Sequence, residues 1–288
     1  MNKISIKTYA KINLSLDVTE KRHDGYHNID SIFEEISLHD VITVTQDESG
    51  IISVSCTKPD IPCNEKNIAY KAADEFFRYS GIKNTGISIH IEKNIPNEAG
   101  MGGGSTNAAG VLKILNRMFD ADLSEQTLME IGLKTGADVP FFIAGGLCYV
   151  TGTGDTVRKL SPLPEHYIAV AKGKAGISTP QAYKEIDTLI NAPHHDSQKL
   201  LSCISSGNIH ELMKNCFNSF ELVNHPDDIE KIKSVMSDNN SVGTLMTGSG
   251  SAVFGIFTDN SSALNAANIL SEIFPFSGVY TNIQNQNP

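Results

Sequence analysis

NIPNEAGMGGGSTNAAGVLKIL, residues 94–115, is the stretch around which the rest of the chain is organised. It opens with a polar turn, passes through Gly100, Gly102, Gly103 and Gly104, and continues as a helix with apolar side chains at helical spacing. Because glycine has no Cβ atom, a glycine run lets several backbone N–H groups point at one place. The first turn of the following helix adds unpaired N–H groups and the positive end of the helix dipole. The stretch therefore predicts an anion cradle, and the anion most often bound in such a cradle is a phosphate.

The junction between the glycines and the helix separates this prediction from a plain loop. Glycine runs are also typical of flexible loops and tight turns. Here the glycines lead directly into Ser105 and Thr106, either of which can cap a helix predicted over residues 105–118. No Gly-Lys-Ser/Thr follows the glycines, so this is not a Walker A loop. The spacing and the acidic residue of a dinucleotide fingerprint are also absent.

Composition and charge narrow the class of protein. With 288 residues, of which 40% are hydrophobic and 19% charged, the chain predicts a packed globular core. A net charge of −10 argues against a nucleic-acid surface. The sequence shows no signal core and no long apolar run, so we expect a cytoplasmic protein that does not span a membrane. No CxxC pair occurs, which favours reduced thiols over disulfides or a zinc site at Cys56, Cys63, Cys148, Cys203 and Cys216.

Alternating and helical patterns predict a mixed fold. Ile12, Leu14, Leu16 and Val18 alternate with polar residues, as in a half-buried strand. We expect further strands at residues 41–45, 51–54, 87–91, 147–151, 167–171, 252–257 and 278–283. We expect helices at residues 67–79, 105–118, 124–134, 198–205, 209–220, 227–237 and 262–273. Because strands and helices do not strictly alternate, an α+β fold is favoured over a doubly wound α/β fold.

Short motifs far apart in the sequence accompany the glycine stretch. They are Ala10-Lys11-Ile12-Asn13-Leu14, Asp24-Gly25-Tyr26-His27, Gly136-Ala137-Asp138-Val139-Pro140, Ser178-Thr179-Pro180 and Gly248-Ser249-Gly250. Each motif alone is weakly specific. In this order, and together with Gly100 to Asn107, they make the chain similar to the GHMP kinases over essentially its whole length.

The resemblance implies a two-domain fold and a kinase activity. It implies an N-terminal ATP-binding domain that carries the phosphate loop, residues 1–160, and a ferredoxin-like C-terminal substrate domain, residues 161–288. Pro162 and Pro164 agree with a junction there. In its detail the resemblance implies ATP- and Mg²⁺-dependent phosphorylation of the 2-hydroxyl of a cytidyl diphosphate of methylerythritol, in non-mevalonate isoprenoid precursor synthesis. It implies no partners beyond these small molecules, in a monomer or weak homodimer.

The resemblance also assigns residues to roles. Lys11 and Asp138 match its catalytic pair. The residues that match its substrate site are Asn13, Tyr26, His27, Thr179 and Tyr183. The residues that match its nucleotide site are Asn67, Lys93, Pro96, Ala99, Gly100, Met101, Gly102, Gly103, Gly104, Ser105 and Thr106. Where this chain has Glu98, Thr106, Ser251 and Ala252, the family often has other residues, and we expect the Glu98 carboxylate to point to solvent.

Elementary chemistry agrees with the catalytic pair. Phosphoryl transfer asks mostly for alignment and charge neutralisation. Lys11 offers a cation beside the transferring group. Asp138 can accept the hydroxyl proton or hold the hydroxyl in line. A carboxylate is a weak base toward an alcohol, so we expect it to accept the proton late in the transfer.

A structural role is the alternative for each of these residues. Lys11 alone is typical of a solvated lysine, and Asp138 of a turn residue ahead of a proline. Tyr26 and Tyr183 alone are typical of half-buried aromatics, and Asn67 of a helix cap. The histidines that we expect at the surface are His23, His194 and His195; no metal-binding spacing occurs.

Two other functions remain open at this point. The first is a GHMP kinase for another small alcohol, against which the paired aromatics Tyr26 and Tyr183 argue, because such a substrate needs no clamp for a base. The second is a catalytically silent binding protein of the same fold. Such a protein could dispense with Lys11 and Asp138, and both are present.

Overall fold

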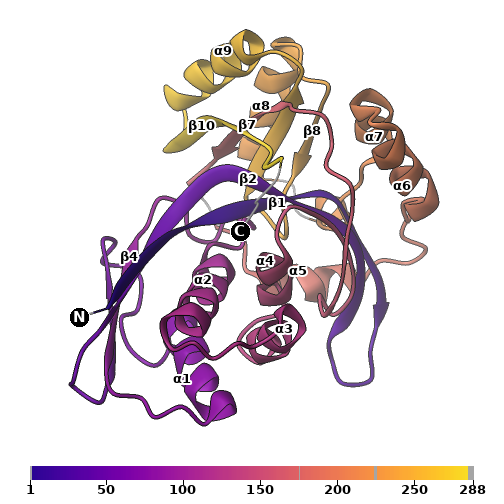
Figure 1. Ribbon diagram of the computed structural model, residues 1–288. Helices are drawn as coiled ribbons and strands as arrows, with labels where there is room; N and C mark the ends of the chain where they lie inside the picture. The colour runs from indigo at the N-terminus through magenta and orange to yellow at the C-terminus, as the bar shows by residue number, and fades with distance from the viewer. Residues whose placement is uncertain (1, 175, 224–225, 285–288) are drawn as a thin grey trace. The chain divides into compact units, whose positions relative to one another are not determined.

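The computed structural model describes residues 2–174, 176–223 and 226–284 (Figure 1). The chain divides into two compact units, each made of separate segments. Unit 1 holds Met1–Ala10, Leu38–Ile95 and Gly102–Gly145. Unit 2 holds Lys11–Ser37, Pro96–Met101 and Gly146–Pro288. A domain boundary near residue 160 stays a prediction.

Unit 1 combines strands with four helices. The strands are the start of β1 (Lys3–Lys21), the end of β2 (His27–Gln46), β3 (Ile52–Cys56) and β4 (Ile87–Glu92). β4 pairs antiparallel with β2 and parallel with β3. The helices are α1 (Ile68–Ser80), α2 (Gly103–Met118), α3 (Glu125–Leu133) and α4 (Val139–Ala144), and they gather below the strands in Figure 1. α1 packs along α2, and α3 packs on α4.

Two of these helices begin at the residues that the sequence indicates. Asn67 caps α1 by accepting a hydrogen bond from the backbone N–H of Ala69, at 2.8 Å. Ser124 caps α3 by accepting one from the N–H of Thr127, at 3.1 Å. The helix starts at residues 67 and 124 were therefore predictable, because a cap depends on neighbouring residues only.

The start of α2 differs from the expectation. The predicted cap at Ser105 or Thr106 is wrong, since the helix begins two residues earlier and its N-cap is Gly102. Gly102 has a φ of +69°, a left-handed conformation that glycine adopts without the steric cost of a Cβ atom. No side chain caps this end, so the first-turn N–H groups keep their binding capacity.

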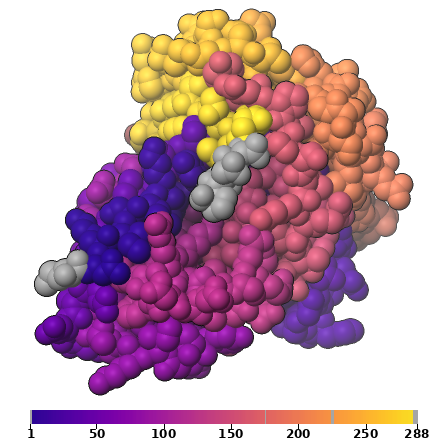
Figure 2. All heavy atoms as spheres, in the orientation of Figure 1, coloured from indigo at the N-terminus to yellow at the C-terminus, as the bar shows by residue number. Residues whose placement is uncertain are grey.

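Unit 2 contains a sheet of β7 (Tyr167–Lys172), β8 (Gly243–Met246), β9 (Ala252–Phe257) and β10 (Phe276–Thr281). Its strands are antiparallel in the order β10-β7-β9-β8, and α8 (Asp227–Asp238) and α9 (Asn260–Ser271) cover one face (Figure 1). This is the ferredoxin-like arrangement expected for the C-terminal half. Figure 2 shows the segment with α9 and β10, in yellow, at the surface.

The remaining elements of unit 2 precede β7 in the sequence or stand between β7 and α8. β5 (Leu147–Gly152) pairs with the start of β2 and with β6 (Thr156–Lys159). The helices between β7 and α8 are α5 (Thr179–Ile186), α6 (Ser197–Ser206), α7 (Ile209–Asn215) and a 3₁₀ turn, Ser219–Leu222. The helix predicted over residues 209–220 is therefore too long, because Cys216 is extended and ends it. The sequence analysis missed α4, α5, β6, β8 and the first half of β2.

β1 is buried more completely than its alternation predicts. Its polar face carries Lys11, Asn13, Ser15 and Asp17, and all four are buried as fully as the apolar face. The prediction of a half-buried strand is therefore wrong for this part of the chain. Buried polar groups are tolerated where they are hydrogen-bonded, and each of these four has partners within unit 2.

Two further findings concern the whole described chain. Within the described ranges, no helix is long and apolar enough to cross a membrane. All five cysteines are free thiols. Burial raises the pKa of the Cys216 thiol, which makes that sulfur a poor nucleophile.

Candidate functional site

The N-terminus of α2 forms the core of the candidate site in unit 1. Gly103 lies in its first turn, where a Cβ atom would stand 2.7 Å from Lys93 Nζ and 3.1 Å from Ile95 Cγ2. A Cβ atom at Gly104 would stand 3.2 Å from Ile68. Thr106 is buried one turn into the helix, so its hydroxyl faces the protein interior. The backbone of this turn is thus held closely from behind, while its N–H groups receive no side-chain cap.

Lys93 is held by a buried ion pair that the sequence analysis missed. Lys93 Nζ lies 2.8 Å from Asp40 Oδ2 and donates to the carbonyl of Ile95 at 2.7 Å. The Asp40 carboxylate is fully buried, and its other oxygen accepts hydrogen bonds from the N–H groups of Asn94 and Ile95. The signal for Asp40 in the sequence is weak, since it is one acidic residue ahead of an apolar strand. The pair fixes the turn that leads into the glycine loop.

Asn67 and Asp138 complete the predicted residues of unit 1. Both polar atoms of the Asn67 side chain have partners, because its amide nitrogen donates to the carbonyl of Pro62 at 2.7 Å. The structural alternative, that Asn67 caps a helix, is thereby confirmed. Asp138 is half-buried at the N-cap position of α4, but its carboxylate does not cap that helix. A capping role therefore does not explain this carboxylate.

Lys11 and Asn13 form the centre of the candidate site in unit 2. Lys11 is 3% exposed, its Nζ donates to Asn13 Oδ1, and it lies 4.5 Å from the centre of the Phe33 ring. The Asn13 oxygen also accepts from the N–H of Gly248 at 2.9 Å, and its amide donates to Ser31 Oγ at 3.1 Å. Lys11 is thus a buried cation on an aromatic face, with its position set by Asn13. The alternative of a solvated lysine is wrong.

The first half of the glycine loop, Pro96–Met101, packs within unit 2. A Cβ atom at Gly100 would stand 2.1 Å from the carbonyl oxygen of Thr247, and Gly100 has a φ of +70°. Both facts require glycine. Ala99 and Met101 are buried, Pro96 is half-buried, and the carbonyl of Met101 accepts from the N–H of Lys11 at 3.1 Å. The loop is thus joined directly to the strand that carries Lys11.

Glu98 and Thr179 border a hollow of about 430 Å³ in unit 2. Glu98 is exposed, as expected for a carboxylate that points to solvent, and its Oε2 would stand 2.6 Å from a Cβ atom at Gly176. Thr179 Oγ1 and Ser249 Oγ are hydrogen-bonded at 2.7 Å. Glu98 also has a φ of +49°, a conformation that favours glycine, which agrees with the small residues common at this position in the family.

Unit 2 brings together aromatic residues that are far apart in the sequence. The rings of His27 and Tyr183 stack, with centroids 4.7 Å apart and an interplanar angle of 19°. Phe220 supports the Tyr183 ring edge-on at 5.0 Å. Tyr26 is 67% exposed, so it is the one predicted aromatic that stands in solvent. Tyr183 thus stacks on His27, and the clamp of Tyr26 and Tyr183 around a base stays a prediction.

The prediction of surface positions for His194 and His195 is only partly right. The ring of His194 is 53% exposed, but that of His195 is 1% exposed. His195 joins Ser15 Oγ, at 2.6 Å, to Asp30 Oδ1, at 2.9 Å. Burial raises the pKa of Asp30, but the hydrogen bonds from His195, Tyr149 and Ser197 outweigh it and leave that pKa below its usual value. This cluster anchors the segment ahead of α6, and one His-His pair in the sequence could not reveal it.

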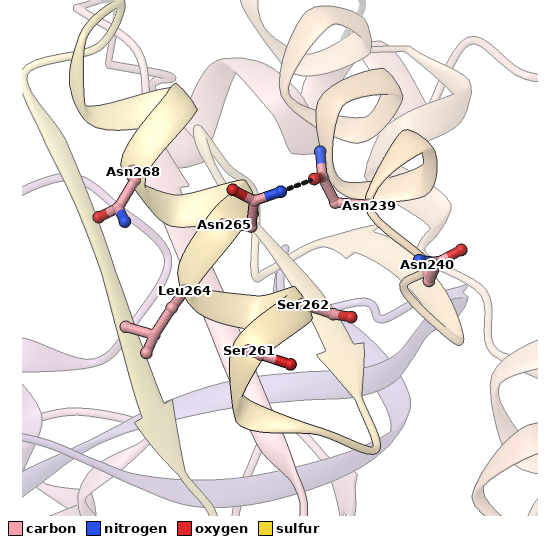
Figure 3. Close-up of a pocket in the computed structure, with 7 residues that line it drawn as sticks. All are labelled: Asn239, Asn240, Ser261, Ser262, Leu264, Asn265 and Asn268. Carbon is pink, nitrogen blue, oxygen red and sulfur yellow. Dashed lines mark hydrogen bonds between the residues drawn. The ribbon is translucent and has the colours of Figure 1, made fainter.

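A second hollow of unit 2, of about 510 Å³, lies at α8 and α9 (Figure 3). Figure 3 shows the seven lining residues: Asn239, Asn240, Ser261, Ser262, Leu264, Asn265 and Asn268. Asn265 donates to Asn239 across it at 2.9 Å. The hollow contains no charged side chain and none of the predicted site residues. It therefore offers no cation to neutralise a phosphate.

Comparisons with known proteins agree with this architecture. The model of the GHMP kinases N terminal domain matches residues 67–146, and that of the GHMP kinases C terminal domain matches residues 200–275. A relative from Caldicellulosiruptor bescii named 4-diphosphocytidyl-2-C-methyl-D-erythritol kinase is 45% identical over 266 residues, which cover 92% of this chain and 93% of the relative. A Clostridium botulinum protein of the same name is 43% identical over 258 residues, which cover 89% of this chain and 91% of that protein.

Solved structures place the fold in the same group. A crystal structure of 4-(cytidine 5'-diphospho)-2C-methyl-D-erythritol kinase superposes with a TM-score of 0.80 at 30% identity, covering 97% of this chain and 99% of the other. The mevalonate kinase of Methanococcus jannaschii superposes with a TM-score of 0.75 at 15% identity, over 99% of both chains. At that identity the second match shows a shared fold only.

Proposed function

Because the chain belongs to the GHMP kinases, and within them to the family of 4-diphosphocytidyl-2-C-methyl-D-erythritol kinases, we propose that it phosphorylates the 2-hydroxyl of that cytidyl substrate with ATP. The observation that carries the proposal is 45% identity over 92% of the chain to a relative of that name. The reaction belongs to non-mevalonate isoprenoid precursor synthesis. The cytoplasm is the expected location, and a monomer or weak homodimer the expected state.

The nucleotide occupies the N-terminus of α2 in this proposal. The N–H groups of Gly102, Gly103, Gly104 and Ser105 cradle the phosphates, since no side chain caps that turn. The loop ahead of it contributes Pro96, Ala99, Gly100 and Met101 to the proposed nucleotide site, and Thr106 and Asn67 support the adenosine side. Lys93 acts from behind the loop, because its ammonium is committed to Asp40.

Mg²⁺ fits this site as a companion of ATP. Across the residues that the structure describes, no group of three or more His, Cys, Asp or Glu side chains could hold a metal ion. Magnesium in nucleotide enzymes is usually held by one or two protein groups together with phosphate oxygens and water. When bound, the cation would supply neutralisation of phosphate charge, and the hydroxyl of Ser105 and the carboxylate of Asp138 are the protein groups of unit 1 that would hold it.

Lys11 and Asp138 have separate tasks in the transfer. Lys11 stabilises the negative charge that the moving phosphoryl group carries, and its buried position strengthens that interaction. Asp138 orients the 2-hydroxyl group and takes its proton as the new P–O bond forms. Asn13 orients the Lys11 amine, with which it shares a hydrogen bond.

The cytidyl group occupies the aromatic surface of unit 2. His27 and Tyr183 supply an imidazole and a phenol ring beside Thr179, and Tyr26 has an exposed ring that can close over a bound base. Stacking is worth about 1–3 kcal/mol per base but accepts every base. Hydrogen bonds must therefore distinguish cytosine from uracil, and the ring of His27 is the group placed to make them.

The test of this function is ADP release with and without the cytidyl diphosphate ester of methylerythritol, called the cytidyl ester below. It is combined with competition between this ester and the corresponding uridyl ester. We expect ADP release to depend on the acceptor and to favour the cytidyl ester. Tyr183→Ala should raise KM for the cytidyl ester about ten-fold, the equivalent of roughly 1.4 kcal/mol, with little change in KM for ATP.

Two results would contradict the substrate assignment. Equal use of both esters would return the protein to a GHMP kinase for another small alcohol. No acceptor-dependent ADP release with any alcohol would favour a silent binding protein of the same fold.

Gly103→Val should weaken ATP binding by at least about ten-fold, roughly 1.4 kcal/mol, while the protein stays folded. The new side chain would displace Lys93 Nζ from behind the first turn of α2 and reorient the N–H groups that bind phosphate. The measurement is calorimetric titration with ATP, with circular dichroism as the folding check. Thr156→Val serves as the control, since it places the same side chain at an exposed position of β6. Unchanged ATP affinity in folded Gly103→Val would contradict the proposal that the first turn of α2 binds the ATP phosphates.

A further inference from the structure

His27 is held from two sides by one helix of unit 2. Tyr183 stacks on the face of the imidazole ring, and Asp187 Oδ1 lies 2.7 Å from its Nε2 atom. Residues 183 and 187 are four apart on α5 and its C-cap, so both side chains project from the same face. The imidazole is 8% exposed. Its orientation is therefore determined by contacts from α5 and its C-cap, and not by a hydrogen bond within its own strand, β2.

The carboxylate of Asp187 also determines which ring nitrogen carries the proton. A carboxylate can only accept hydrogen bonds, so the Nε2 atom of His27 must be the donor. In the neutral imidazole the other nitrogen, Nδ1, then carries a lone pair. The His27 ring makes no other hydrogen bond within the described ranges, so this lone pair faces no protein donor there.

Asp187 lies at the C-terminal end of α5, a position that is unfavourable for a negative charge. It is the C-cap of α5, and the negative end of a helix dipole disfavours a carboxylate. Two partners offset that cost. Lys21 Nζ lies 2.5 Å from Asp187 Oδ2, and His27 Nε2 lies 2.7 Å from Asp187 Oδ1. The hydrogen bond from Lys21, followed by that from His27, holds the pKa of Asp187 below its usual value. The carboxylate is therefore charged at neutral pH, and it joins the C-cap of α5 to Lys21 at the end of β1 and to His27 at the start of β2.

We propose that Asp187 is the positioning residue for base selection: it makes the Nδ1 atom of His27 a hydrogen-bond acceptor, which suits the exocyclic amine of cytosine. This inference rests on the proposed function. Uracil has a carbonyl oxygen in place of that amine, so two acceptors would face each other. Asp187 itself acts on the substrate only through His27, because both of its oxygens are engaged by Lys21 and His27.

The variant Asp187→Asn should exchange the donor and acceptor roles of the two ring nitrogens of His27. Lys21 can only donate, so it attracts the amide oxygen of the new asparagine and turns the amide NH₂ group toward His27 Nε2. Nε2 must then accept, and the proton moves to Nδ1, which becomes a donor. We expect KM for the cytidyl ester to rise and its preference over the uridyl ester to fall, each by about ten-fold or more. We expect kcat and KM for ATP to stay within about two-fold of wild type, since neither chemistry nor nucleotide contacts Asp187.

A second substitution tests the mechanism directly. In Asp187→Asn combined with Lys21→Met, nothing holds the amide oxygen away from His27, so the amide can turn and accept from Nε2 again. The preference for the cytidyl ester should recover by at least half on a logarithmic scale. Glu185→Gln is the matched control, because it removes the same charge from the same helix at a half-buried carboxylate that accepts from Gln181. It should leave both KM values unchanged.

The proton on His27 can be observed without any substrate. Two-bond ¹H–¹⁵N correlation spectra, with the His27 signal assigned by its loss in His27→Gln, should show Nε2 protonated in wild type and Nδ1 protonated in Asp187→Asn. Wild type with an unprotonated Nε2, or a spectrum unchanged in Asp187→Asn, would overturn the positioning role. A changed spectrum with unchanged base preference would overturn it as well. If the spectra behave as expected but no cytidyl ester is phosphorylated, the proposed function fails while the control of His27 by Asp187 stands.

Discussion

Asp138→Asn is expected to lower kcat by about 10²–10⁴-fold while ATP still binds. The amide cannot take the proton of the acceptor hydroxyl, although it keeps the shape of the carboxylate and one of its two acceptor oxygens. The fold should survive, because the Asp138 side chain does not cap α4 and the residue is only half-buried. The measurement is steady-state turnover with the cytidyl ester, alongside ATP titration.

Asp122→Asn is the control for the Asp138 experiment. Asp122 is exposed in the same unit and has a φ of +49°, which asparagine tolerates, so this variant removes one carboxylate without strain. We expect it to behave as wild type. Turnover of Asp138→Asn within a few-fold of the control would exclude Asp138 from proton transfer.

Lys11→Met should lower kcat by roughly 10²–10³-fold, with KM for ATP changed only a few-fold. The Lys11 charge matters most as the phosphoryl group moves, so its loss raises the barrier more than it weakens binding. Methionine fits the buried path of the lysine stem over Phe33. Asn13 keeps its hydrogen bonds to Gly248 and Ser31, so the backbone at these residues should not rearrange.

The matched control for Lys11 lies on the same strand. Lys7 is exposed on β1, and Lys7→Met removes the same charge from it. We expect that variant to keep full activity. If Lys11→Met instead raises the ATP dissociation constant while kcat is preserved, Lys11 is a binding residue and has no part in the transition state.

Two helix caps and one continuous apolar strand were the most predictable features of the fold. Asn67 and Ser124 begin their helices as expected, because an N-cap needs only the backbone two or three residues ahead. β9 spans the predicted residues 252–257, since a continuous apolar run between turns is a strong local signal. α5 was missed because it has only eight residues and no side-chain hydrogen bond caps its start.

The start of α2 shows where local reasoning fails even in a well-marked motif. Ser105 and Thr106 are good capping residues, but Gly102 takes a left-handed conformation first and begins the helix. Gly100, earlier in the same loop, passes within contact distance of Thr247. A residue 147 positions away thus sets the geometry of the loop.

Periodicity, capping residues and glycine spacing by themselves determined the α+β class, most helices and strands, and the glycine loop ahead of α2. These features follow from interactions between residues within a few positions of each other. Only the tertiary structure decided which polar side chains are buried and with what partner: Lys93 with Asp40, Asn13 with Gly248, and His27 with Asp187. The last two pairs are 235 and 160 residues apart, and a buried polar group must find its partner wherever the fold brings one. No local pattern can encode a contact at that separation.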